Sequence, residues 1–109
     1  MSAYIILQIN IINKEPYIIN KEPYIINKEP YKEYLKKVTP IVKKYWGKYI
    51  ARGGSYKIML GKWDYERTVI IKFSTFDNAI TWYNSSEYSP VKKIREDNSE
   101  GNAIIIEGL

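Results

Sequence analysis

Histidine and cysteine are both absent from the 109 residues of this chain. Without cysteine there can be no disulfide bonds, no thiolate nucleophile and no cysteine-ligated metal. Without histidine the chain lacks the side chain that most often acts as a general base or binds a transition metal. No spaced cluster of acidic residues takes their place, so we expect neither a metal nor a cofactor.

Long apolar runs are also missing. No segment approaches the roughly 20 apolar residues that a membrane-spanning helix needs. The stretch from Met1 to Tyr4 has neither the basic region nor the cleavage signal of a secretory peptide. We therefore expect a cytoplasmic protein with no membrane partner.

The composition, with 45% hydrophobic and 27% charged residues, is that of an ordinary folded protein. A chain of 109 residues can build one hydrophobic core but not two, and we interpret residues 1–109 as one domain. The net charge is +5, and much of the excess lies on one predicted helix. Its lysines are Lys32, Lys36, Lys37, Lys43, Lys44 and Lys48. We interpret them as a solvated helix face and expect no nucleic-acid partner.

A heptapeptide, Ile-Ile-Asn-Lys-Glu-Pro-Tyr, occurs three times without substitution over residues 11–31. Each copy holds one lysine and one glutamate, so the extra copies add no net charge. Proline in every copy forbids the continuous helix that a seven-residue period would otherwise suggest. We interpret residues at about 14–27 as a structural insertion between the first strand and the first helix. The sequence leaves three conformations open for this insertion: a short hairpin, a one-turn helix or a disordered loop.

Hydrophobic periodicity predicts an alternation of strands and helices. Strands are expected at 3–12, 48–60, 68–73 and 102–107, and a first helix at about 30–46. We interpret Gly53-Gly54-Ser55 as a bulge that keeps residues 48–60 in one edge strand. Ser74 and Asp77 form a capping-box pattern, which predicts a second helix that breaks at 84–86 and resumes through Arg95. The order βαββαβ predicts a ferredoxin-like α+β fold, with an antiparallel sheet and two helices on one face.

Three of the predicted strands are apolar on successive residues, at 5–7, 69–71 and 104–106. Both faces of such strands favour burial, and the helices of one chain can cover only one face of a sheet. A second copy packed against the other face resolves this, so we expect a homodimer. The alternative is that these short strands only carry a high β-propensity.

A set of motifs gives the chain a family resemblance. They are Arg52-Gly53-Gly54, Gly61-x-Trp63 with Arg67, Trp82-Tyr83-x-Ser85-x-Glu87-Tyr88, Arg95 and Glu107-Gly108. On these motifs, residues 1–12 joined to 31–109 resemble the family called domain of unknown function 1330, within the dimeric α/β-barrel superfamily. The chain differs at Asp64 and Ser86, where the family has proline. The resemblance implies a homodimer whose sheets enclose a barrel, and it implies no established activity.

Catalytic residues are unknown from the sequence. Some enzymes of the superfamily work without a cofactor and others bind haem, but haem ligation by histidine is impossible here. A cofactor-free reaction would need a base, and Asp64, Glu66, Glu107 or a tyrosine could serve. Nothing distinguishes one of them, so whether the protein is an enzyme stays open.

A candidate ligand site can still be named. It consists of Arg52, Gly53, Gly54, Trp63, Tyr83, Tyr88 and Arg95. An arginine beside backbone that only glycine permits can clamp a carboxylate or a phosphate. Aromatic side chains can line an apolar pocket at one end of a sheet.

Structural explanations compete with this site. Gly53 and Gly54 could form the bulge while Arg52 pairs with Glu107. The aromatic residues could fill the core or an interface. Arg95 could pair on the helix surface with an acidic neighbour, namely Glu87, Glu96 or Asp97.

Three functions follow from these readings. The first is binding, or cofactor-free turnover, of a small organic molecule. The second is a structural or regulatory dimer with no ligand. The third is nucleic-acid binding through the lysine helix, but residues 68–73 lack the aromatic spacing of an RNA-recognition motif.

Overall fold

A computed structural model describes residues 1–12 and 29–109. Its elements, in chain order, are β1 (Ala3–Ile11), α1 (Glu29–Lys44), β2 (Lys48–Arg52), β3 (Arg67–Phe73), α2 (Phe76–Tyr83), α3 (Tyr88–Asp97) and β4 (Ser99–Glu107). The expected insertion at about 14–27 lies outside the described residues. Within these ranges no helix combines the length and apolar character needed to cross a membrane.

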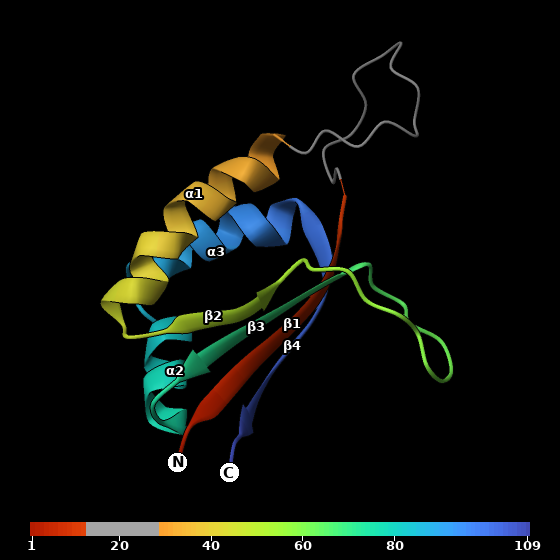
Figure 1. Ribbon diagram of the computed structural model, residues 1–109. Coiled ribbons are helices and arrows are strands. Elements are labelled where there is room, and N and C mark those ends of the chain that lie inside the picture. Colours follow the sequence, from red (N-terminus) through yellow and green to blue (C-terminus); the bar gives the residue numbers. More distant parts are fainter. Residues whose placement is uncertain (13–28) are drawn as a thin grey trace.

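The four strands form one antiparallel sheet in the order β2-β3-β1-β4 (Figure 1). β1 is a central strand, and Ile5 lies opposite both Ile71 of β3 and Ile105 of β4. The predicted α+β fold with an antiparallel sheet is therefore confirmed. The expected break at 84–86 is also confirmed, because it separates α2 from α3.

The core lies between the sheet and the helices. Successive strand residues point to opposite faces, and the alternate residues Ala3, Ile5, Leu7 and Ile9 of β1 are all buried. α1 contributes a buried stripe at helical spacing. Its members are Tyr31, Tyr34, Val38 and Val42. α1 thus lies on the sheet with one apolar face, and its lysines point outward.

The predicted edge strand at 48–60 is wrong. β2 ends at Arg52, and the irregularity in its pairing with β3 falls between Tyr49 and Ala51 rather than at the glycine pair. Gly53 has a positive φ of 66°, which turns the chain away from the sheet. Because β3 begins only at Arg67, residues 56–60 have no strand to pair with. Residues 53–66 instead form an arm that projects from the sheet (Figure 1).

Two further boundaries differ from the sequence prediction. The N-cap of α2 is Thr75, whose hydroxyl accepts a hydrogen bond from the Asn78 amide at 3.0 Å, so the predicted capping box at Ser74 is wrong. β4 begins at Ser99, three residues before the predicted strand because its pairing with β1 extends to Ile11.

One glycine in β4 leaves no room for a side chain. Gly101 lies opposite Ile9, and a Cβ atom there would collide with the Gln8 carbonyl. We expect Gly101→Ala to lower the free energy of unfolding by about 2–4 kcal/mol, because the two strands must separate locally. Urea denaturation measures this.

Gly54→Ala is the matched control, since a Cβ atom at Gly54 meets nothing within 4 Å. It should change the free energy of unfolding by less than about 0.5 kcal/mol. Equal effects of the two substitutions would contradict the close approach of β4 to β1.

Candidate functional site

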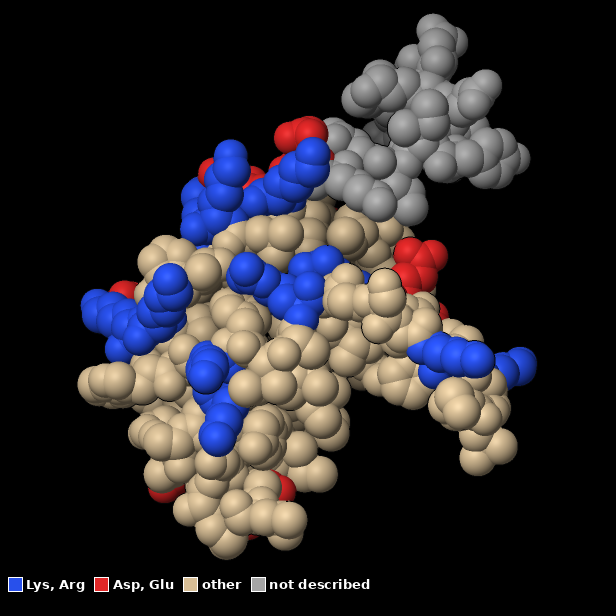
Figure 2. Space-filling view, in the orientation of Figure 1, with Lys and Arg blue, Asp and Glu red and all other residues tan. Residues whose placement is uncertain are grey.

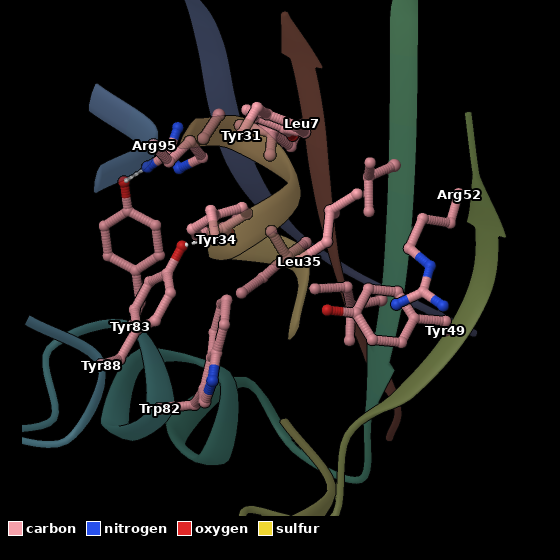
Figure 3. A pocket seen from close by; sticks show the side chains of 14 residues that line it. Leu7, Tyr31, Tyr34, Leu35, Tyr49, Arg52, Trp82, Tyr83, Tyr88 and Arg95 are labelled. Carbon is pink, nitrogen blue, oxygen red and sulfur yellow. Dashed lines mark hydrogen bonds between the residues drawn. The ribbon is translucent and has the colours of Figure 1, made fainter. Parts of the chain in front are cut away.

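A small cavity lies between α1 and the sheet and is called the inner cavity below (Figure 3). Its lining residues are Ile5, Leu7, Tyr31, Tyr34, Leu35, Tyr49, Arg52, Val69, Ile71, Trp82, Tyr83, Tyr88, Arg95 and Ala103. The cavity volume is about 20 Å³, which is room for about one water molecule. Five aromatic residues on the helices and two arginines thus surround a nearly filled space.

Aromatic stacking organises the wall made by α2 and α3. The rings of Trp82 and Tyr88 stack with centroids 4.2 Å apart, and Tyr83 meets Tyr88 edge-on at 5.8 Å. The hydroxyls of Tyr88 and Tyr34 are 2.8 Å apart and share a hydrogen bond, which ties α3 to α1. Burial raises the pKa of the Tyr88 hydroxyl and raises that of Tyr34 well above its ordinary value. Both hydroxyls are therefore neutral near pH 7.

Arg95 closes one end of the inner cavity. It lies in the last turn of α3 and is only 7% exposed. Its Nη2 donates a hydrogen bond to the Tyr83 hydroxyl at 3.1 Å (Figure 3), while its Nε has no hydrogen-bond partner among the residues that the structure describes. The predicted surface pairing of this arginine is wrong because burial removes it from the helix surface.

Two of the acidic residues proposed as partners of Arg95, Glu87 and Asp97, bind lysines instead. The Glu87 carboxylate accepts hydrogen bonds from Lys44 at 2.8 Å and Tyr45 at 3.2 Å, and its bond with Lys44 lowers the pKa of Glu87. Asp97 pairs with Lys93 at 3.3 Å. No salt bridge within residues 1–12 and 29–109 includes an arginine.

Arg52 lies at the opposite end of the inner cavity, at the last position of β2. Its guanidinium is 4.3 Å from the centroid of the Tyr49 ring, and Nη1 donates a hydrogen bond to Thr39 Oγ1 at 2.9 Å. The proposed pairing with Glu107 is wrong, since β2 and β4 are the two outer strands of the sheet.

The glycine pair lies next to Arg67 and away from the inner cavity. A Cβ atom on Gly53 would overlap the guanidinium of Arg67, whereas one on Gly54 would meet nothing. Gly53 therefore leaves space for the Arg67 side chain, which reaches the Tyr31 ring at 5.6 Å from its centroid. Neither glycine lines the inner cavity.

Trp63 is not brought to the inner cavity either. It lies in the arm, is 44% exposed, and its ring centroid is 6.4 Å from that of Tyr56. Of the predicted site residues, the structure brings together Arg52, Tyr83, Tyr88 and Arg95.

Sequence reasoning missed several residues of the inner cavity. Tyr31 and Tyr34 are three residues apart on α1, so both face the sheet, and this spacing was available in the sequence. Tyr49 was missed because its position depends on how the edge strand β2 pairs with β3.

A larger groove adjoins the inner cavity and is called the outer groove below. Its lining residues are Ile5, Phe76, Tyr83, Ala103, Ile104 and Ile105, and its volume is about 350 Å³. Three of them also line the inner cavity, namely Ile5, Tyr83 and Ala103. The outer groove is apolar and lies between α2 and β4, with Tyr83 at the boundary. Within the described ranges, no group of three or more acidic side chains is placed to hold a metal ion.

Comparisons with known proteins agree on a family and a fold. Residues 15–109 match the family described as Domain of unknown function (DUF1330). The crystal structure of RPA0582, a protein of unknown function from Rhodopseudomonas palustris, is similar with a TM-score of 0.74 and 14% identity, covering 99% of this chain and 82% of that chain. A structure of methylated RPA0582 is similar with a TM-score of 0.74 and 15% identity, covering 99% and 81%. No curated protein matches the chain significantly.

The buried tyrosines predict how stability depends on pH. Unfolding exposes the Tyr34 and Tyr88 hydroxyls, which then ionise near pH 10, while the folded state keeps them protonated. The unfolded state therefore binds fewer protons above about pH 10, and the free energy of unfolding falls as pH rises. Tyr34→Phe should make this alkaline decrease shallower in urea denaturation between pH 8 and 11.

Tyr56→Phe serves as the control, because Tyr56 lies in the arm and is 52% exposed. It should leave the alkaline decrease of the wild type unchanged. A Tyr34→Phe protein with the wild-type pH dependence would show that the Tyr34 hydroxyl is not buried.

Proposed function

The chain belongs to the Domain of unknown function (DUF1330) family, and we propose that it binds a small organic molecule in the outer groove. The observation that supports this is the continuity of the two spaces. An apolar groove of about 350 Å³ adjoins a buried group of tyrosines and an arginine, and Tyr83 lines both. Small-molecule sites typically combine apolar walls with a few converging polar groups.

Binding without turnover is the form of this function that the side chains favour. None of Asp64, Glu66 and Glu107 lines the inner cavity or the outer groove. Burial raises the pKa values of Tyr31, Tyr34, Tyr49 and Tyr88, which moves them further from a base that works near neutral pH.

A thermal-shift screen tests ligand binding. The panel contains small neutral, anionic and cationic compounds, both aromatic and aliphatic. We expect at least one compound to raise the melting temperature of the wild type with a saturable concentration dependence. Ala103→Phe should abolish this stabilisation, because Ala103 lines the outer groove on an exposed strand and a larger side chain there would fill it.

Glu107→Phe is the matched control, since Glu107 lies further along β4 on the same face and outside both spaces. It should keep the response to the ligand. If no compound stabilises the wild type, or Ala103→Phe responds as the wild type does, the ligand-free structural or regulatory module becomes the better description.

The same proposal includes an assembly. We propose a ferredoxin-like domain that forms a homodimer through the sheet face opposite the helices. The strand order β2-β3-β1-β4 and the helices on one face support the fold. On the other face Ile104 and Ile106 are 54% and 49% exposed, and in the arm Met59 and Leu60 are 82% and 92% exposed. Apolar exposure on this scale is typical of an interface.

Sedimentation equilibrium tests the homodimer. The wild type should be a dimer at micromolar concentration, and Ile104→Glu should weaken the dimer at least tenfold, because a carboxylate would be buried in the interface. Trp46→Glu is the control, as Trp46 is 77% exposed at the turn after α1. It should leave the dimer intact, and a monomeric wild type would contradict the assembly.

A nucleic-acid partner is not part of the proposal. Figure 2 shows basic side chains gathered over α1, with acidic side chains among them. Three of these lysines pair with glutamates at 2.8–3.3 Å, namely Lys32 with Glu29, Lys37 with Glu33 and Lys44 with Glu87. A helix face whose charges are partly neutralised in this way supports a solvated surface.

A further inference from the structure

Arg95 is a buried positive charge with no negative partner among residues 1–12 and 29–109. A guanidinium stays protonated in proteins, and burying an ion without a counter-charge is unfavourable unless other groups compensate. Arg95 is 7% exposed, and its guanidinium donates a hydrogen bond to the Tyr83 hydroxyl at 3.1 Å. Its Nε is buried with no partner. The described residues around Arg95 therefore neither neutralise its guanidinium nor accept a hydrogen bond from its Nε.

The surrounding tyrosines do not supply the missing charge. Tyr34 and Tyr88 stay protonated near neutral pH, because burial raises the pKa of each hydroxyl. They share one hydrogen bond with each other. As neutral hydroxyls they can donate to an anion or orient around it, but they cannot balance the guanidinium.

Other cations lie on the same side of the sheet. The described residues that line the inner cavity include Arg52 and Arg95 but no aspartate or glutamate. Arg67 lies beside the Tyr31 ring, and its Nε is likewise buried without a partner. Lys92 has its Nζ 4.6 Å from the centroid of the Tyr83 ring. The region around Tyr83 is therefore positive, and only an anion from outside the described chain would neutralise it.

Tyr83 connects the positive charge of Arg95 with the outer groove. Tyr83 lines the outer groove and also accepts the hydrogen bond from Arg95. From these observations we propose that the ligand is an organic acid, with its apolar body in the outer groove and its carboxylate hydrogen-bonded to Arg95 at the Tyr83 end. This inference rests on the proposed ligand-binding function and adds the chemical class of the ligand.

A carboxylate fits this end better than a phosphate does. A carboxylate is flat, carries one charge and pairs with the fork of one guanidinium. A phosphate monoester carries close to two charges and three strong acceptor oxygens. The inner cavity, at about 20 Å³, has room for about one water molecule. A small planar group can enter this space with less movement of the aromatic wall than a tetrahedral group.

Matched acids and amides test the inference on the wild-type protein. The probes are benzoate, phenylacetate and hexanoate, each compared with its neutral amide by calorimetric titration at pH 7. We expect each acid to bind about 10- to 100-fold more tightly than its amide, the range for a hydrogen bond to a charged group. Phenylphosphonate serves as the phosphate-like comparison and should bind more weakly than benzoate.

Arg95→Met tests the residue itself. It removes the charge and keeps an apolar side chain, so the acids should lose their advantage over the amides. Without ligand the variant should melt at the wild-type temperature or above it, because an unneutralised buried charge has been removed. Lys93→Met, on the exposed side of the same helix, is the control and should keep the preference for acids.

The outcomes separate this inference from the proposed function. If amides bind as tightly as acids, or phenylphosphonate binds more tightly than benzoate, the carboxylate assignment is overturned while ligand binding stands. A lower melting temperature of ligand-free Arg95→Met, with the acid preference kept, would make Arg95 structural and overturn the inference. If Arg95→Met does not fold, Arg95→Lys is tested instead. An affinity for the acids at least tenfold below that of the wild type supports the inference. An affinity equal to that of the wild type overturns it. If no compound of any charge binds, the proposed function fails as well.

Discussion

The stack between Trp82 and Tyr88 is the contact on which the rest of this structure depends. Their ring centroids are 4.2 Å apart across the break that separates α2 from α3. Ser85 holds the break, because its hydroxyl donates to the Trp82 carbonyl at 2.8 Å and accepts from the Tyr88 amide at 3.1 Å. Trp82 also packs against Phe73 of β3 at 5.5 Å, and Tyr88 binds Tyr34 of α1. One aromatic pair thus connects the sheet and all three helices.

The position of the candidate site follows from that stack. Tyr83 comes directly after Trp82, and its ring meets Tyr88 edge-on at 5.8 Å, so it is held where the outer groove meets the inner cavity. Arg95 comes two turns after Tyr88 on the same helix and therefore lies on the same buried side. A shift of α3 along α1 would move Arg95 and Tyr88 together, because both lie on α3.

A protein built only for stability would not need this arrangement. Buried ionic groups can often be replaced by packed apolar side chains with no loss of stability. Here Arg52 and Arg67 lie over the rings of Tyr49 and Tyr31, and Arg95 donates a hydrogen bond to the Tyr83 hydroxyl. Contacts with an aromatic face or a hydroxyl hold a guanidinium in position without neutralising it. None of these three contacts supplies a carboxylate to the arginines.

The sequence alone determined the order of strands and helices and the break at 84–86, because these depend on local periodicity and turn chemistry. Tertiary structure decided where β2 ends, because a strand continues only while its neighbour pairs with it, and β3 begins at Arg67. It also decided that Arg95 is buried while Glu87 pairs with Lys44, 43 residues away in the chain. Helical spacing shows which residues share a face, but whether a charged residue meets solvent or a core depends on what packs over it.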